Sequence, residues 1–171
     1  MVCRPACSPF PDPSCTWPSS TWRTCAPPRN SPLLADFIAL LEPINALADA
    51  APGFVRRMKG GGPADTIPHD YGDHLLLNLS VWEDRDSLWN YVYRSGHLGA
   101  LQRRREWFHR MAEPYSAMWW IPAGTLPTIE EAMERLELLR AHGPSPAAFT
   151  FKDFYDSSEA ASLPAAAAAR K

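Results

Sequence analysis

The stretch YRSGHLGALQRRREWFHRM, residues 93–111, gathers side chains that commonly handle anions and protons. It contains five Arg and two His among aromatic residues. Guanidinium groups bind carboxylates through paired hydrogen bonds, and imidazole rings exchange protons near neutral pH. Only those side chains that point inward can form a site, and helical spacing predicts which ones do.

A helix from His97 to about Met111 places two of these cations on its apolar side. Successive residues on a helix are turned by about 100°, so the apolar residues collect in one arc. His97 and Arg104 fall in the middle of that arc, among Ala100, Leu101, Trp107, Phe108, Met111 and Ala112. The opposite side carries Gln102, Arg103, Glu106, His109 and Arg110, and we expect these side chains to be solvated.

Arg104 and His97 each allow two interpretations. A buried guanidinium without a partner costs about 3–5 kcal/mol, so Arg104 needs a carboxylate, carbonyl groups or a bound anion. It either forms a structural pair with a carboxylate such as Glu83, or extends past the core edge, or lines a pocket. His97 is either a hydrogen-bonded core residue or a base or metal ligand.

Residues 68–74, PHDYGDH, contain candidate metal ligands. The spacing of these ligands, His69, Asp70, Asp73 and His74, matches no established metal motif, and Pro, Asp and Gly favour an ordinary turn. We therefore expect no metal site. The chain also lacks a P-loop, a dinucleotide fingerprint and a nucleophile elbow, and we expect no cofactor.

The composition restricts the class of protein. The chain has 171 residues, of which 46% are hydrophobic and 21% charged, and its formal net charge is −2. These values predict one domain and neither a nucleic-acid nor a membrane partner. All four Cys lie within the first 25 residues, and residues 1–30 lack the apolar block of a signal peptide, so we expect a cytoplasmic protein.

The residue patterns divide the chain into three segments. Residues 1–30 are rich in Pro, Ser and Cys and have neither a helical nor a strand period, which predicts a disordered or mistranslated segment. Residues 31–155 form the expected domain, and residues 156–171 an Ala-rich disordered tail. Within the domain we expect a helix over 32–50, strands over 54–60 and 74–83, a helix over 85–111 interrupted at Ser95-Gly96, a strand over 115–122, a helix over 128–142 and an edge strand over 148–154.

This order predicts an α+β fold. It is one strand short of the ferredoxin-like split βαβ plan, with helices on one face of the sheet, and the missing strand would precede the first helix.

Three motifs resemble an uncharacterised bacterial family catalogued as a domain of unknown function. They are N-x-S-V-W at residues 78–82, H-x-x-x-L-x-R-R-R-x-W-F at 97–108 and W-W-x-P-A-G-x-x-P at 119–127. The resemblance covers about residues 31–152. That family is grouped with the dimeric α+β barrel proteins, which include the antibiotic biosynthesis monooxygenases. The resemblance therefore implies a homodimer in which two sheets form a barrel, with a cavity between each sheet and its helices.

The resemblance to this superfamily also implies roles for individual residues. Its cofactor-independent oxygenases use an Asn and a Trp near a phenolic substrate, which Asn78 and Trp82 resemble. Its haem-degrading members use a helical His as iron ligand, which His97 resembles. The leading hypothesis is a cofactor-independent monooxygenase acting on a small aromatic or phenolic metabolite, with Asn78, Trp82, His97 and Arg104 in the pocket. The alternatives are haem binding through His97 and a non-catalytic ligand-binding or structural dimer.

The sequence departs from the family at its start. Where the family begins with a strand, this chain reads STWRTCAPPRN, residues 20–30. We therefore expect the first strand to be missing or altered, as a shifted reading frame or misassigned start would cause. The gene decides this hypothesis: it is wrong if neither alternative frame encodes an alternating apolar strand upstream of Ser31.

Overall fold

The computed structural model describes residues 15–24, 32–61, 66–71 and 75–161. Its strands pair antiparallel in the order β2-β3-β1-β4, and a short β5 also pairs with β1. The strands are β1 (Cys15–Thr24), β2 (Phe54–Arg57), β3 (Leu75–Trp82), β4 (Ser116–Met118) and β5 (Ile121–Pro122). This is the strand order of the split βαβ plan, and it confirms the predicted α+β, ferredoxin-like fold class.

Side-chain hydrogen bonds fix where some of the helices begin. They are α1 (Ala35–Asp49), α2 (Arg85–Arg94), α3 (His97–Arg103), α4 (Ile129–His142) and α5 (Ser157–Ala161). The Asp84 carboxylate accepts a hydrogen bond of 2.7 Å from the Ser87 backbone N–H and caps α2. Thr128 caps α4 in the same way, and Gly143, with φ 77°, ends it. None of the described helices is long and apolar enough to cross a membrane.

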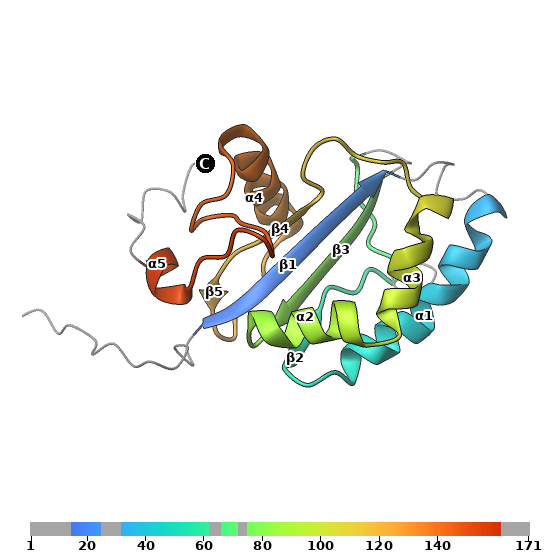
Figure 1. Cartoon of the computed structure of the whole chain (residues 1–171), viewed down its shortest axis with the longest axis horizontal. Coiled ribbons are helices and arrows are strands. Elements are labelled where there is room, and N and C mark those ends of the chain that lie inside the picture. Colours follow the sequence, from blue (N-terminus) through green and yellow to red (C-terminus); the bar gives the residue numbers. More distant parts are fainter. Residues whose placement is uncertain (1–14, 25–31, 62–65, 72–74, 162–171) are drawn as a thin grey trace, which may run out of the picture.

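Helices cover both faces of the sheet, which differs from the expected single covered face. In Figure 1, α1, α2 and α3 gather on one side of β1 and β3, and α4 lies on the other. The residues of β3 alternate between these sides because successive side chains of a strand point in opposite directions. Leu77, Leu79 and Val81 pack with α4, whereas Trp82 packs with α1 and α2.

The structure corrects the expectation that residues 1–30 contribute no strand. β1 pairs with β3 from Trp17 opposite Trp82 to Thr24 opposite Leu75, and with β4 on its other edge. A central strand is held by backbone hydrogen bonds to two neighbours, which need no apolar alternation in its sequence. The missing-strand expectation is therefore wrong for residues 15–24. Residues 1–14 and 25–30 lie outside the described residues.

The helix expected to reach Met111 ends earlier. α3 stops at Arg103, and one 3-10 turn, Arg104–Glu106, follows it. Trp107 and Phe108 are then both buried in one cluster with Leu34. The ring centroid of Phe37 lies 5.4 Å from that of Trp107 and 5.0 Å from that of Phe108. Adjacent helical residues point about 100° apart, so leaving the helix allows both rings to pack on the same cluster.

Two expectations near the C-terminus are also corrected. Residues 148–154 take part in two isolated bridges, Met118 with Phe149 and Ser145 with Ala148, rather than in an edge strand. The Thr150 hydroxyl accepts hydrogen bonds of 3.2 Å from the backbone N–H groups of Lys152 and Asp153, which turns the chain away.

The expected tail begins with the short helix α5. Asp156 and Glu159 bond each other's backbone N–H groups at 2.7 and 2.9 Å, as a capping box does. Hydrogen bonds from the Ser158 hydroxyl and the Glu159 backbone lower the pKa of Asp156. Residues 162–171 lie outside the described residues.

Candidate functional site

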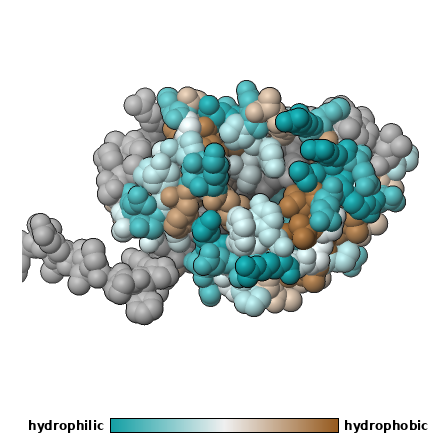
Figure 2. Space-filling view, viewed as in Figure 1, coloured by the Kyte–Doolittle hydropathy of each residue, from teal (hydrophilic) through white to brown (hydrophobic). Residues whose placement is uncertain are grey.

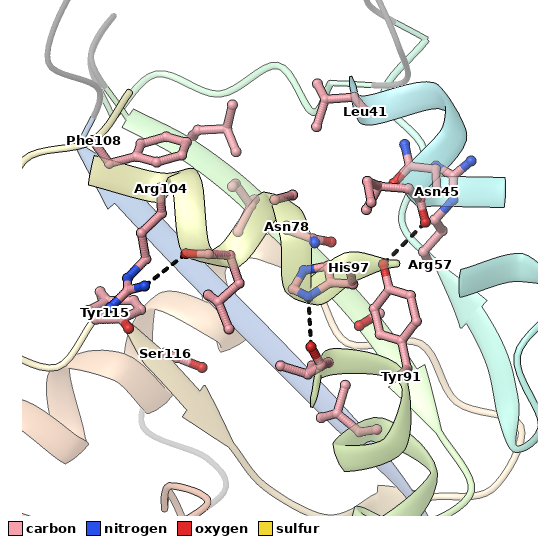
Figure 3. A pocket seen from close by; sticks show the side chains of 18 of the residues that line it. Leu41, Asn45, Arg57, Asn78, Tyr91, His97, Arg104, Phe108, Tyr115 and Ser116 are labelled. Atoms are coloured by element: carbon pink, nitrogen blue, oxygen red, sulfur yellow. Dashed lines mark hydrogen bonds between the residues drawn. The ribbon is translucent and has the colours of Figure 1, made fainter. Parts of the chain in front are cut away.

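A cavity of about 510 Å³ lies between the sheet and helices α1, α2 and α3. Its walls are mainly apolar, and its polar side chains come from several elements (Figure 3). These polar residues include Asn45, Arg57, Asn78, Ser80, Tyr91, His97, Arg104, Tyr115 and Ser116. Figure 2, in the same view as Figure 1, shows apolar side chains between the polar ones on the surface that faces the viewer. A cavity of this size with few convergent polar groups is typical of a small-molecule site.

Asn78 reaches the cavity because of its place in β3. Leu77 and Leu79 on either side of it are buried towards α4. Asn78 therefore points to the other side, where it lines the cavity and is exposed. The alternation of side chains along β3 thus places an amide, with both donor and acceptor groups, among aliphatic walls.

Arg104 lines the same cavity from the 3-10 turn after α3. Its Nη1 donates a hydrogen bond of 2.8 Å to the Leu101 carbonyl oxygen, and the side chain is half-buried. Among the described residues no carboxylate forms an ion pair with it, so the predicted alternative of a structural pair with Glu83 is not found there. Arg104 therefore brings a positive charge to the cavity wall that a carbonyl group only partly stabilises.

His97 lines the cavity from the first turn of α3. Its ring Nδ1 lies 3.2 Å from the Val92 carbonyl oxygen, and its backbone N–H donates to the Ser95 hydroxyl at 3.1 Å. Because a carbonyl oxygen only accepts, this bond places the proton of the neutral ring on Nδ1. Nε2 is then the atom that accepts a proton or a hydrogen bond.

Trp82 was predicted to line the pocket, and this prediction is wrong. Its side chain is fully buried and is not among the described residues that line the cavity. The indole Nε1 donates a hydrogen bond of 3.0 Å to the Ser80 hydroxyl, and its ring stacks on Tyr91 with a centroid distance of 5.1 Å. Trp82 shares the cavity-facing side of β3, but Leu88, Ala48 and Phe54 cover it. Trp82 therefore lies next to the cavity, behind the lining residues Ser80 and Tyr91.

Tyr91 also lines the cavity. Its hydroxyl donates a hydrogen bond of 3.2 Å to the Ile44 carbonyl oxygen, which ties α2 to α1. Its ring centroid lies 4.9 Å from that of His97. Burial raises the pKa of the phenol well above its ordinary value, with Arg57 opposing the rise and Asp49 adding to it. Tyr91 thus remains a neutral hydrogen-bond donor at physiological pH.

Arg57 is a lining residue that the sequence analysis missed, because the pairing of β2 shifts. The register between β2 and β3 jumps between Phe54 and Arg56, so simple alternation along β2 does not predict which Arg faces the cavity. Arg57 donates to the Asp49 carboxylate at 3.0 Å, and its side chain is only 10% exposed. The sequence contains one signal for this ion pair, because Asp49 ends α1 only a few residues before β2 and its two Arg begin.

Of the candidate metal ligands in residues 68–74, the two that the structure describes, His69 and Asp70, do not line this cavity. His69 has Nε2 3.1 Å from the Leu75 carbonyl oxygen and accepts from the Tyr71 backbone N–H at 3.3 Å, as expected for a turn. Within the described residues, no group of three or more His, Cys, Asp or Glu forms. Asp73 and His74 lie outside the described residues.

Several solved structures are similar to this chain. SnoaB, a cofactor-independent oxygenase from Streptomyces nogalater, is 20% identical, and the match covers 67% of this chain and 99% of SnoaB with a TM-score of 0.44. The Pseudomonas aeruginosa protein PA3566 is 14% identical, and the match covers 68% of this chain and 99% of PA3566 with a TM-score of 0.45. A candidate antibiotic biosynthesis monooxygenase from Chloroflexus aurantiacus is 10% identical, and the match covers 67% of this chain and 98% of that protein with a TM-score of 0.42. Similarities of this size carry no information on activity.

The family model gives a firmer result. No curated protein matches the chain. The model described as Domain of unknown function (DUF3291) matches residues 21–165, which include the end of β1, all of the other strands, and helices α1 to α5. Because this match spans most of the sequence, the chain belongs to the DUF3291 family.

Proposed function

We propose that this protein is a cofactor-independent oxygenase that acts on a small, electron-rich aromatic molecule bound in the cavity. The observation that carries the proposal is the cavity of about 510 Å³, which Asn78, His97 and Arg104 line among mainly apolar walls. The resemblance of the chain to the monooxygenase superfamily supports the reaction class. The walls provide the apolar contact that an aromatic ring needs.

The chemistry requires only groups that this cavity contains. A phenol that gains one oxygen atom and loses two hydrogens becomes a quinone, while the second atom of O₂ leaves as water. The substrate supplies all the electrons, so neither a metal nor a flavin is needed for the balance. The protein has to bind the ring, accept a proton from it and stabilise the anion that then reacts with oxygen.

Three residues match these tasks. Nε2 of His97 accepts the phenolic proton, since Nδ1 is committed to the Val92 carbonyl oxygen at 3.2 Å. The amide of Asn78 donates a hydrogen bond to the substrate oxygen. Arg104, which has no carboxylate partner among the described residues, adds a positive charge to the cavity wall, and this charge favours a substrate that carries a negative charge. Tyr91 holds the His97 side of the cavity through its contact with the imidazole ring.

Oxygen uptake tests this proposal. The purified protein, given a panel of phenols and hydroquinones, should consume oxygen faster than a blank. His97→Ala should slow uptake by about 100-fold or more, the usual contribution of a general base. The matched control is His109→Ala, because His109 is exposed and does not line the cavity. Uptake that equals the blank across the panel, or that survives His97→Ala unchanged, contradicts the proposal.

The same purified protein distinguishes the alternatives. Titration with hemin tests haem binding through His97: a Soret shift that His97→Ala abolishes would favour it over the oxygenase. Saturable binding of an aromatic ligand with no oxygen uptake would favour a non-catalytic ligand-binding protein. The homodimer that the resemblance implies remains a prediction, and sedimentation equilibrium measures it.

A further inference from the structure

The charges that line the cavity have one sign. Among the described lining residues are the cations Arg57, Arg104 and Lys152, and none of these lining residues is Asp or Glu. A small-molecule cavity with this composition favours an anionic ligand, because the lining cations attract the anion and the anion reduces the repulsion between them.

The three cations are not equivalent. Arg57 is paired with the Asp49 carboxylate at 3.0 Å, so its charge is already compensated from behind the cavity wall. Lys152 is exposed, and water stabilises its charge. Arg104 is half-buried and bonds only the Leu101 carbonyl oxygen among the described residues, at 2.8 Å. Of the three cations, Arg104 is therefore the one whose charge a negatively charged ligand stabilises most.

The geometry separates this position from the proposed reacting groups. Figure 3 shows the Arg104 side chain directed towards Tyr115 and Ser116, whereas the His97 ring lies on the other side, beside Tyr91. Tyr115 and Ser116 also line the cavity and bring hydroxyl groups to the Arg104 end. A planar guanidinium with hydroxyl groups near it matches the two oxygens of a carboxylate.

The ionisation of the ligand favours a carboxylate over a phenolate at this end. An ordinary phenol has a pKa of roughly 10 and a carboxylic acid one of roughly 4, so at neutral pH only the acid arrives already charged. A guanidinium group is positively charged at neutral pH. It is best compensated by a ligand that already carries its negative charge at that pH.

We propose that the ligand is an aromatic carboxylic acid whose carboxylate binds Arg104 and whose ring extends towards Asn78 and His97. This inference rests on the proposed function in taking the same cavity as the binding site, and it adds the substrate class. Because Arg57 is already paired, one carboxylate is sufficient, and a second acidic group adds little affinity. The cavity thus selects aromatic monoacids over their neutral analogues.

Calorimetric titration with 2-naphthoate and with 2-naphthamide tests the proposal, since the two probes share ring and shape and differ in charge. The wild-type protein should bind naphthoate at least about tenfold more tightly than the amide, the gain expected of a charge-assisted pair. Arg104→Met should remove this preference by weakening naphthoate binding alone. Arg104→Lys should keep part of this preference, because Lys retains the positive charge but cannot form the paired hydrogen bonds of a guanidinium.

A matched control separates the site from the general charge of the protein. Arg105 is the next residue along the chain, is exposed and does not line the cavity, so Arg105→Met should retain the wild-type preference. Circular dichroism of each variant confirms that it is folded. Equal affinity for the two probes, no binding of either, or a preference that survives Arg104→Met overturns the inference.

Oxygen uptake then distinguishes this inference from the proposed function. The pair 2,5-dihydroxybenzoate and 2,5-dihydroxybenzamide offers an oxidisable ring with and without the carboxylate. Equal uptake with both overturns the carboxylate inference and leaves the oxygenase standing. Naphthoate binding that depends on Arg104, without uptake on any ring, supports the inference and contradicts the oxygenase.

Discussion

The two sides of β3 are built from alternating residues of one strand, yet they pack in opposite ways. On one side Leu77, Leu79 and Val81 are at most 5% exposed and contact Leu136 and Leu139 of α4. On the other side Leu76, Asn78 and Ser80 line a cavity of about 510 Å³ beneath α1 to α3. The same strand therefore supplies both a closed core and the wall of a binding site.

The helices explain this difference. α4 is a single helix that places three of its residues, Ala132, Leu136 and Leu139, directly on the sheet. The other side is covered by helices that meet one another as well as the sheet: Tyr91 of α2 bonds Ile44 of α1, and Phe37 of α1 packs on Phe108 beyond α3. The covering helices thus bury part of their surface against one another, and the cavity lies between them and β3. The side of β3 under α4 is packed because α4 lies directly on the sheet. The side under α1 to α3 contains a cavity because these helices bury part of their surface against one another.

The largest test of this contrast compares two leucines of β3. Leu79→Ala should lower the free energy of unfolding by about 2–5 kcal/mol, because it leaves a void in a core that cannot collapse around it. Leu76→Ala should cost less, below about 2 kcal/mol, because Leu76 is half-buried at the wall of an existing cavity. Urea unfolding measures both values.

Two results would contradict the contrast between the sides of β3. Equal losses in the two variants would show that the side under α1 to α3 is as tightly packed as the side under α4. A smaller loss for Leu79→Ala than for Leu76→Ala would reverse the assignment of core and cavity.

Trp82 marks where the hollow side becomes closed, and its substitution tests that boundary. Trp82→Phe removes the hydrogen bond to the Ser80 hydroxyl and part of the buried ring, so it should lower the free energy of unfolding by about 1–3 kcal/mol. Because Trp82 does not line the cavity, the affinity for 2-naphthoate should be unchanged. Weaker binding at unchanged stability would instead place Trp82 in the ligand site, as the sequence resemblance predicted.

Much of the contrast was predictable from local patterns. Alternation along residues 74–83 predicted both faces of β3, and helical phasing separated Arg104 and His97 from the solvated Arg103. These predictions hold because the period of side-chain direction depends only on the local backbone. The cap at Thr128 was also predictable, because Thr followed three residues later by Glu is a local pattern that is typical of a helix start.

What the sequence did not predict depends on contacts between distant segments. β1 has no alternation to identify it, and its place follows from backbone pairing with β3 and β4. Trp82 and Asn78 have equivalent positions in the period of β3, but only the fold shows that Leu88 and Ala48 cover the one and not the other. Arg57 faces the cavity because of a register shift that no periodic pattern contains.

The smallest effect concerns Tyr91, which lies between the closed end at Trp82 and the cavity at His97. Tyr91→Phe loses the hydrogen bond to the Ile44 carbonyl oxygen and should cost about 0.5–1.5 kcal/mol at neutral pH. Because burial raises the pKa of Tyr91 in the folded protein, the unfolded chain releases the phenolic proton first as the pH rises. The wild-type protein should therefore lose stability above about pH 10, and Tyr91→Phe should lose less over the same range. Urea unfolding at several alkaline pH values measures both. A difference between the two proteins that stays constant with pH would show that the pKa of Tyr91 is the same in the folded and the unfolded chain, and would contradict the burial of its hydroxyl.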